Sequence, residues 1–330
     1  MVVVSSPGKV TLFGEHAVVY GEPAIAVAID KRVRVRIEKR DDGAVRVEAR
    51  DLVLAGFNAL LMPNGSVTLE GESSKVLSAL SYVKRAVELV REKFCVNVGA
   101  HITVTSEMPV GAGLGTSAAV AVSVVKAYSL LAGLDLSKDE CAELGYQVEL
   151  SVQGRASRMD STVTAIGGAL YIDPKREKVY EELRGAEGLS GLVVGYVSRE
   201  ASTGEMVDRV KRLKDSFPEV LDLVIRAIGE VSRRAKRAIE LGRVEELGYL
   251  MNMNHGLLEA IGVSTSKLSQ MVYAARAAGA LGSKITGAGG GGCIVALAPQ
   301  REEELIAALR AIGATAFKVQ PSSDGVRVEE

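Results

Sequence analysis

The stretch "MPVGAGLGTSAAVAVSVVKAYSLL", residues 108–131, organises the chain around one junction. Three glycines, Gly111, Gly113 and Gly115, occupy alternate positions directly before a run that is apolar almost all round. A glycine inside a helix or strand costs about 0.5–1 kcal/mol relative to alanine, so three at one place indicate a backbone that side chains would obstruct. A helix that is apolar on every side is a buried helix. The sequence therefore predicts a tight loop followed by a buried helix that begins near Thr116.

The glycine loop has the chemistry of an anion-binding site. Consecutive N–H groups can approach one anion there, and the helix behind adds unpaired N–H groups and the positive end of its dipole. A dinucleotide loop requires the spacing G-x-G-x-x-G and an acidic residue after a second strand, whereas here the spacing is G-x-G-x-G and Asp135 follows a helix. A P-loop is excluded as well, because no lysine follows Gly115. A phosphate cradle and a plain structural turn both remain open.

Outside this junction, strand and helix patterns mix without strict alternation. In the first half, β-branched runs predict strands at 9–15, 24–40, 44–54, 100–107 and 167–174, and helical patterns predict helices at 74–94 and 137–153. In the second half, strands are expected at 191–198, 291–299 and 314–320, and helices around 205–240, 243–260, 265–278 and 301–311. This mixture indicates an α+β fold with two domains, 1–175 and 176–330.

Composition narrows the class of protein. A formal net charge of -1 over 330 residues argues against binding to nucleic acid or to an anionic membrane surface. The strongest basic run, at 233–237, lies in a helical pattern and is interpreted as a solvated helix face. Cys95, Cys141 and Cys293 are too far apart for a metal motif or a disulfide framework. The N-terminus has no basic, apolar leader, so we expect a soluble protein of the cytoplasm.

Two further segments place reactive groups next to glycine. The run "ITGAGGGGCIVAL", residues 285–297, contains G-x-G-x-x-G, but a strand pattern follows it, so the dinucleotide interpretation fails. Its consecutive glycines indicate either a loop that closely approaches a ligand or a flexible surface turn. The N-terminal segment "SSPGKVTLFGEHAVVYGEPAIA" brings Lys9, Glu15 and His16 into one strand and turn, where surface charge is the alternative explanation.

A fourth segment, "VQGRASRMDSTVTAIGG", carries Asp160 after a helix. Loops hold functional residues disproportionately often, so the carboxylate is a candidate for the active site. An aspartate before serine and threonine is also a frequent helix cap, and a helix that starts at Ser161 would make Asp160 such a cap.

These four segments, in this order, resemble the GHMP kinase superfamily and, within it, the mevalonate kinase family in its archaeal form. The motifs that carry the resemblance are "PGKVTLFGEHAVVYG" at 7–21, "PVGAGLGTSAA" at 109–119 and "KITGAGGGGC" at 284–293. The similarity extends over essentially the whole chain. It implies an N-terminal mixed α/β domain with the phosphate loop, a ferredoxin-like C-terminal domain, and an active site in the cleft between them.

The resemblance also implies roles for individual residues. Asp160 matches the catalytic aspartate and Lys9 the lysine that pairs with it, while Ser117 and Glu149 match metal ligands. Glu15 and His16 match positions near the acceptor substrate. The ATP-binding loop comprises Pro109, Val110, Gly111, Ala112, Gly113, Leu114, Gly115, Thr116, Ser117, Ala118 and Ala119, and the closing loop comprises Gly287, Ala288, Gly289 and Gly290. One departure is visible, since Arg158 and Met159 precede Asp160 where many relatives have Pro-Ser-Gly.

The implied reaction transfers the γ-phosphoryl group of ATP to the 5-hydroxyl of mevalonate with Mg²⁺, in isoprenoid biosynthesis, in a homodimeric enzyme. The carboxylate of mevalonate requires a cation or hydrogen-bond donors, for which Arg199 is the candidate, beside Ser202 and Thr203. A related kinase that acts on phosphomevalonate or on another mevalonate hydroxyl, and a non-catalytic ligand sensor on the same fold, remain the alternatives.

Overall fold

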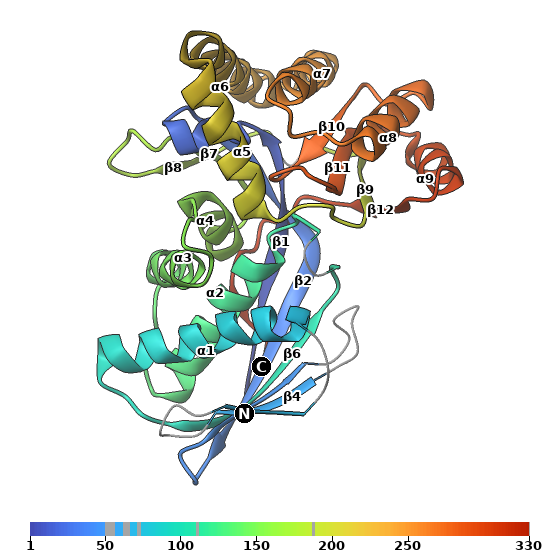
Figure 1. The fold of residues 1–330 in the computed structure, drawn as a ribbon. Coiled ribbons are helices and arrows are strands. Elements are labelled where there is room, and N and C mark those ends of the chain that lie inside the picture. Colours follow the sequence, from blue (N-terminus) through green and yellow to red (C-terminus); the bar gives the residue numbers. More distant parts are fainter. Residues whose placement is uncertain (50–56, 62–66, 71–73, 110–111, 187–188, 330) are drawn as a thin grey trace.

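The computed structural model describes residues 1–49, 57–61, 67–70, 74–109, 112–186 and 189–329. These residues form two units, each built on its own β-sheet, with the long strands of the first unit running up to the second (Figure 1). The N-terminal unit carries helices α1 to α4, and the C-terminal unit carries α5 to α9.

Two long strands form the centre of the first sheet. β1 (Val2–Phe13) pairs antiparallel with β2 (Ala24–Arg40), and the 3₁₀ turn η1 (Ala17–Tyr20) connects them. Both strands are rich in β-branched residues, which suit a pleated and buried surface. Within the described residues the sheet order is β13-β1-β2-β6-β3-β4-β5, and β7 pairs with β2 and β8. The remaining strands are β3 (Val45–Ala49), β4 (Phe57–Leu61), β5 (Val67–Glu70), β6 (Gly99–Ser106), β7 (Ala169–Ile172), β8 (Tyr180–Glu182) and β13 (Arg327–Val328).

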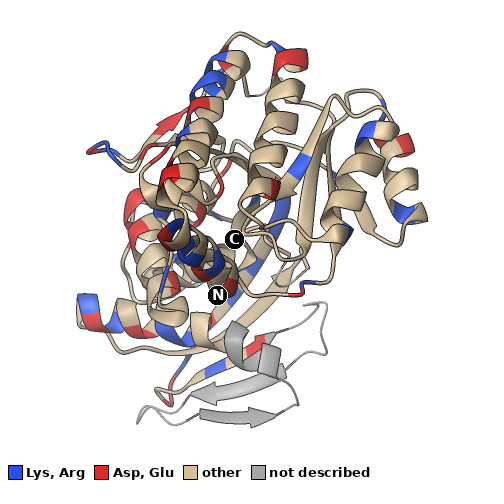
Figure 2. Ribbon diagram, turned by 45° about the horizontal axis from the view of Figure 1, so that its top comes forward, with Lys and Arg blue, Asp and Glu red and all other residues tan. Residues whose placement is uncertain are grey.

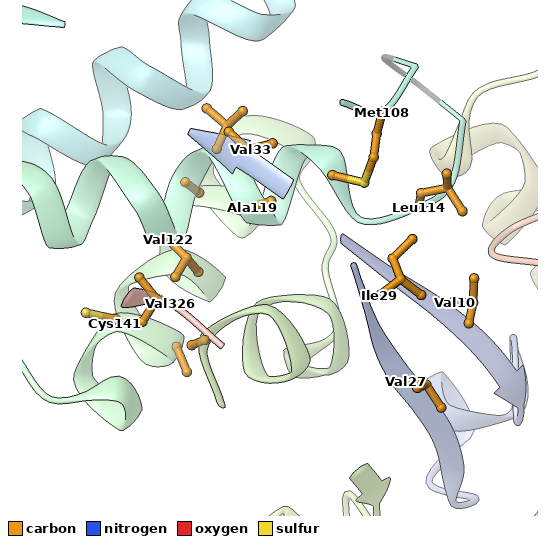
Figure 3. Packing of buried hydrophobic residues seen from close by; sticks show 14 of the residues in the cluster. Val10, Val27, Ile29, Val33, Met108, Leu114, Ala119, Val122, Cys141 and Val326 are labelled. Carbon is orange, nitrogen blue, oxygen red and sulfur yellow. The ribbon is translucent and has the colours of Figure 1, made fainter. Parts of the chain in front are cut away.

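The described part of this unit contains four helices. They are α1 (Ser74–Phe94), α2 (Thr116–Leu131), α3 (Lys138–Gln153) and α4 (Arg158–Ile166). The central helix α2 contacts β1, β2 and the three other helices, and it is buried along most of its length, as its apolar sequence predicted. Met108 and Leu114, at the two ends of the glycine loop, belong to the same buried cluster as Val10 and Ile29, so the loop is fixed to the core on both sides (Figure 3).

The second unit has the ferredoxin-like arrangement. Its sheet order is β10-β11-β9-β12, formed by β9 (Leu192–Val197), β10 (Gly282–Thr286), β11 (Gly292–Leu297) and β12 (Thr315–Val319), all antiparallel. With helices between β9 and β10 and between β11 and β12, this is the β-α-β-β-α-β order. The helices are α5 (Thr203–Ser216), α6 (Pro218–Glu240), α7 (Val244–Ala260), α8 (Ser266–Ala277) and α9 (Glu302–Ala311).

The two units share core and backbone contacts. Val194 and Val295 of the second sheet belong to the main hydrophobic cluster of the first unit, whereas Val193 and Ile294 face a cluster of their own. Successive strand residues point to opposite faces, so the second sheet is buried on both sides. At the C-terminus, β13 returns to pair with β1. The predicted boundary between 175 and 176 falls in the turn between β7 and β8 and stays a prediction.

Charged residues of both signs are mixed on the surface of the helices. Figure 2 shows Lys and Arg interleaved with Asp and Glu on the helices. In the basic run of α6, Arg233 pairs with Glu22 at 2.9 Å, Arg234 with Glu246 at 2.7 Å, and Lys236 with Glu181 at 2.7 Å. The cysteines are free thiols. Across the described ranges, no helix combines the length and apolarity needed to cross a bilayer.

Several elements differ from the sequence prediction. The strands β4, β5, β8 and β13 were not predicted, and two further differences have a clear physical reason. The single helix expected at 205–240 is two helices, because the chain turns at Phe217 and α6 begins at Pro218, which is favoured at the first helical position. The strand β10 was not predicted, since its sequence "GSKIT" is short, begins with glycine and contains a lysine.

Candidate active site

A cavity of about 830 Å³ lies where the two units meet. Its walls come from β1 and η1, the start of α2, the α3–α4 segment, the β9–α5 connection and the β10–β11 loop. Part of the wall is apolar and is lined by Val47, Val83, Val104 and Val120, while Tyr82 interacts through its phenol with Ser117 and Glu149. Lys9, Glu149, Asp160 and Arg199 line the polar part. The cavity therefore combines apolar surface with a cluster of charges.

The Lys9–Asp160 pair is formed across the cavity wall. Lys9 Nζ lies 3.0 Å from Asp160 Oδ1 and donates a hydrogen bond to Thr11 Oγ1 at 3.2 Å. The lysine side chain is 2% exposed, whereas the aspartate is 28% exposed, so the carboxylate is the partner that faces the cavity. The ammonium group of Lys9 is buried, and a buried charge requires a partner, so Lys9 depends on the carboxylate of Asp160.

The interpretation of Asp160 as a helix cap is wrong. Helix α4 begins at Arg158 after Ser157, which puts Asp160 in the first turn of the helix rather than before it. An acidic side chain there is favoured by the helix dipole. The two residues that depart from the family pattern are both accommodated. Arg158 forms a double hydrogen bond with Glu143, and Met159 is buried against the cavity.

Gly115 makes room for the lysine. Its φ of +73° lies in the left-handed region, and a Cβ atom there would lie 2.9 Å from Lys9 Cγ. Lys9 N also donates to Leu114 O at 2.8 Å, so the strand and the loop fix each other. The glycine therefore serves both the turn into α2 and the position of the catalytic candidate Lys9.

Replacing Gly115 by alanine is expected to lower kcat by about 10²-fold, because a displacement of about 1 Å in a catalytic group has that effect. Gly133→Ala is the matched control, since Gly133 has φ +80° with no atom within 4 Å of the added Cβ. Both variants should lose about 1–2 kcal/mol of unfolding free energy through the left-handed alanine. Steady-state kinetics and thermal melts compare them, and equal kcat in the two variants would refute the packing role.

Ser117 and Glu149 form the second pair in the cavity. Ser117, in the first turn of α2, donates from Oγ to Glu149 Oε1 at 3.1 Å, and Glu149 lies on α3. Burial, and then the negative charge of Asp160, raises the pKa of Glu149 to about 8. Among the described residues, no lysine, arginine or histidine forms a salt bridge with the Glu149 carboxylate.

The predicted ATP-binding loop divides between cavity and core. Gly113, Gly115, Thr116 and Ser117 line the cavity. Ala112, Leu114, Ala118 and Ala119 are fully buried and pack in the core, while Pro109 accepts a hydrogen bond from Thr116 Oγ1 at 3.4 Å. Val110 and Gly111 lie outside the described residues.

The second glycine loop divides in the same way. Gly287 and Ala288 line the cavity, and a Cβ atom at Gly287 would lie 3.2 Å from Gly113 O, so the two glycine loops touch. Gly289 and Gly290 do not line it. They pack against Val263 and Met206 of the second unit.

Glu15 and His16 reach the cavity, but each also has a protein partner. Glu15 forms a buried ion pair with Lys284 and accepts a hydrogen bond from Asn254 Nδ2 at 3.2 Å. His16 Nε2 lies 2.9 Å from Ala288 O. Burial lowers the pKa of His16, so its imidazole is neutral at pH 7. The carboxylate of Glu15 is therefore already compensated before any ligand binds.

Arg199 lies at the meeting point of the two loops. Its guanidinium donates from Nη1 to Thr203 Oγ1 at 3.0 Å, and Nε is buried without a hydrogen-bond partner among the described residues. A Cβ atom at Gly113 would lie 3.5 Å from Nη2, and one at Gly292 would lie 3.3 Å from Nε. Arg199 thus faces the polar part of the cavity with one donor unused.

Several residues of the site were missed from the sequence. Lys284 is fully buried beside Glu15, and Thr286 accepts a hydrogen bond from Thr11 N at 2.8 Å. Arg155 lines the cavity and pairs with Asp208. A lysine three residues before the first glycine of a glycine-rich loop was the available signal for Lys284. The other contacts join segments distant in sequence and gave no local signal.

Comparisons with known proteins show which family the chain resembles. The chain matches the models for the GHMP kinases N terminal domain at residues 81–168 and the GHMP kinases C terminal domain at 235–315. It is 47% identical over 335 aligned positions to mevalonate kinase of Thermococcus onnurineus, covering 100% of this chain and 98% of that protein.

Solved structures agree with the fold as a whole. The Methanococcus jannaschii mevalonate kinase matches with a TM-score of 0.78 and 28% identity, covering 97% of this chain and 98% of that one. The L. major mevalonate kinase in complex with R-mevalonate matches with a TM-score of 0.79 and 26% identity, covering 96% and 95%. With its two GHMP kinase domains and its full-length similarity to archaeal relatives, this chain belongs to the mevalonate kinase family of the GHMP kinases.

Proposed function

We propose that the protein transfers the γ-phosphoryl group of ATP to the 5-hydroxyl of (R)-mevalonate, giving 5-phosphomevalonate and ADP. One observation carries the proposal: the Lys9–Asp160 pair and the N-terminus of α2 face the same cavity. Phosphoryl transfer requires a group that receives the proton of the acceptor hydroxyl and an array of donors that holds the phosphates. The archaeal relatives, named mevalonate kinases, support the choice of acceptor.

ATP binds with its phosphates at the start of α2 and its base in the apolar part of the cavity. Backbone N–H groups around Gly113 to Ser117 point to the phosphates, and the helix dipole favours their negative charge. The valines at 47, 83, 104 and 120 offer an apolar environment to the purine. Gly287 and Ala288 approach the phosphates from the second unit.

Ser117 and Glu149 fit a Mg²⁺ site. A hydroxyl and a buried carboxylate without a salt-bridge partner in the described part of the chain are oxygen ligands of the type Mg²⁺ prefers, completed by waters and phosphate oxygens. When bound, the metal would neutralise charge on the β- and γ-phosphates. No described group of three or more His, Cys, Asp or Glu side chains forms a dedicated metal cage, which is the usual case for Mg²⁺ at a nucleotide.

Asp160 acts late on the acceptor hydroxyl. Full deprotonation of an alcohol by an ordinary carboxylate spans about 12 pKa units, or roughly 16 kcal/mol at 1.36 kcal/mol per unit. A turnover of about 10 s⁻¹ corresponds to a total barrier near 16 kcal/mol, which leaves nothing for the transfer itself. Asp160 therefore orients the hydroxyl and accepts its proton as the new P–O bond forms in a loose transition state. Lys9, whose Nζ lies 3.0 Å from Asp160 Oδ1, holds the carboxylate in place and stabilises charge on the attacking oxygen.

The acceptor lies beside Asp160, with Glu15 and His16 close to it. Arg199 binds its carboxylate, because its guanidinium lines the cavity and a charge-assisted hydrogen bond between a guanidinium and a carboxylate is strong. Ser202 and Thr203, at the start of α5, line the same wall and supply further donors.

The acceptor assignment is tested by ADP release from Mg·ATP with mevalonate, 5-phosphomevalonate, galactose and homoserine. We expect mevalonate alone to turn over well. Robust turnover of 5-phosphomevalonate without turnover of mevalonate would make the protein a related kinase, and ATP binding without any turnover would make it a ligand sensor. The homodimer and the cytoplasmic location stay predictions, and light scattering of the purified protein tests the first.

A further inference from the structure

The backbone at His16 is unusual for a residue with a side chain. His16 has φ 61° and ψ −44°, outside the conformations that L-residues ordinarily adopt. Such a conformation costs free energy and persists only where the surrounding structure holds it. Glycine, which has no Cβ, adopts positive φ more readily than a histidine does. The imidazole is 6% exposed, and we infer that this buried side chain has a role that glycine could not fill.

The side chain of His16 joins the two units. Its Nε2 lies 2.9 Å from the carbonyl oxygen of Ala288. A carbonyl oxygen accepts hydrogen bonds only, so Nε2 carries the hydrogen and donates it. His16 lies between β1 and η1 of the first unit, whereas Ala288 lies on the glycine loop between β10 and β11 of the second unit.

Ala288 lies between two parts of the glycine loop: the part before it contacts the first unit, and the part after it is hydrogen-bonded within the second unit. Before it, Thr286 Oγ1 accepts from Thr11 N at 2.8 Å, and Gly287 packs on Gly113 of the phosphate loop. After it, Gly290 is bonded within the second unit. Its N–H donates to Val263 O at 2.9 Å, and its carbonyl accepts from Glu200 N at 2.8 Å and Ala201 N at 3.0 Å.

We propose that His16 is a positioning residue for the glycine loop, and that its Nε2–H holds the Ala288 carbonyl away from the nucleotide phosphates. A free carbonyl in the cavity wall would present a partial negative charge to a triphosphate. With that oxygen bonded to His16, the loop stays against Gly113 in the conformation that approaches the phosphates. This role rests on the proposed binding of ATP at Gly113–Ser117, and it differs from a direct contact between His16 and the acceptor.

The test compares His16→Gln with His16→Met. Both side chains have similar length and both variants keep the backbone strain, but only glutamine places an N–H donor near the position of Nε2. Hydrogen exchange is measured in the ATP-free protein over segments 9–13 and 286–292. We expect His16→Met to exchange at least 10-fold faster in these segments and His16→Gln to stay within about 3-fold of the unsubstituted protein. Segment 302–311, in α9, should not change.

Kinetics add a second measurement. We expect KM for ATP to rise about 10-fold in His16→Met and clearly less in His16→Gln, with a smaller change in KM for mevalonate. If hydrogen exchange in His16→Met is unchanged, or if it is accelerated equally in both variants, the proposed positioning role of the His16–Ala288 hydrogen bond is wrong.

Should the methionine variant fail to fold, His16→Asn takes its place. Asparagine tolerates positive φ, but its shorter amide does not extend to the position of Nε2. Hydrogen exchange is followed without substrate, so it tests the positioning role of His16 independently of the kinase reaction. Failure of the proposed kinase reaction would show instead as no ADP release from the unsubstituted protein.

Discussion

Replacing Asp160 by asparagine lowers kcat by about 10²–10⁴-fold, the usual effect of removing a general base, while the affinity for ATP changes little. The amide has the same shape as the carboxylate but cannot accept the hydroxyl proton. ATP affinity depends on backbone donors at the start of α2, which the substitution leaves in place. ADP release measures kcat, and calorimetric titration with a non-hydrolysable ATP analogue measures binding.

The Lys9–Asp160 contact complicates this experiment, and a double-mutant cycle resolves it. Asp160→Asn leaves the Lys9 ammonium, 2% exposed, without its anionic partner, so part of the loss could come from a displaced lysine. Lys9→Met removes the cation alone, and the double variant removes both. If Asp160 serves only to hold Lys9, the double variant should be no slower than Lys9→Met. A base role predicts that it is slower by at least 10-fold, and near-normal kcat in Asp160→Asn would exclude that role.

Local patterns predicted most elements of this fold. The helix over 74–94 and the strand over 24–40 agree with α1 and β2, because long periodic segments leave little ambiguity. The capping box at Ser137 and Glu140 is formed in full. One helix was predicted over 205–240 where the structure has two, although Pro218 in the sequence indicated the start of the second. Proline is compatible with the first turn of a helix, so it marks a new start there as well as an end.

The contacts within the candidate active site could be predicted less well from local sequence patterns. Lys9 and Asp160 were paired through family resemblance, and no spacing in the sequence brings β1 and α4 together. The Glu15–Lys284 pair depends on how the second sheet packs against β1, and the strained backbone of His16 has no sequence signature. Such contacts are set by tertiary packing, which periodicity does not encode. The same limit explains why four members of the predicted ATP-binding run, such as Leu114, face the core.

Glu149→Gln is expected to stabilise the metal-free protein at alkaline pH and to weaken its use of Mg²⁺. Burial and the nearby Asp160 raise the pKa of Glu149 to about 8, above its ordinary value of 4.5. Between these values the folded state holds a proton that the unfolded state has released. The contribution of Glu149 to folding therefore becomes less favourable as pH rises from about 4.5 to about 8, and the full cost is present above that.

Glutamine removes this titration while keeping an oxygen that accepts from Ser117. At pH 9, without metal, the variant should exceed the unsubstituted protein in unfolding free energy by up to about 5 kcal/mol, at 1.36 kcal/mol per pKa unit. At pH 4.5 the two should be nearly equal. Glu143→Gln on the same helix is the control, because Glu143 is 39% exposed and paired with Arg158, and it should show no such gain.

Magnesium should reverse this order. A carboxylate ligand must be deprotonated to bind the metal, so binding Mg·ATP offsets the cost of the Glu149 charge in the unsubstituted protein and offsets less in Glu149→Gln. Denaturant melts at pH 9 with and without Mg²⁺ and an ATP analogue, together with the Mg²⁺ concentration for half-maximal ADP release, measure both effects. We expect that concentration to rise at least 10-fold in Glu149→Gln. An unchanged Mg²⁺ requirement would remove Glu149 from the metal site, even if the pH-dependent gain in stability were found.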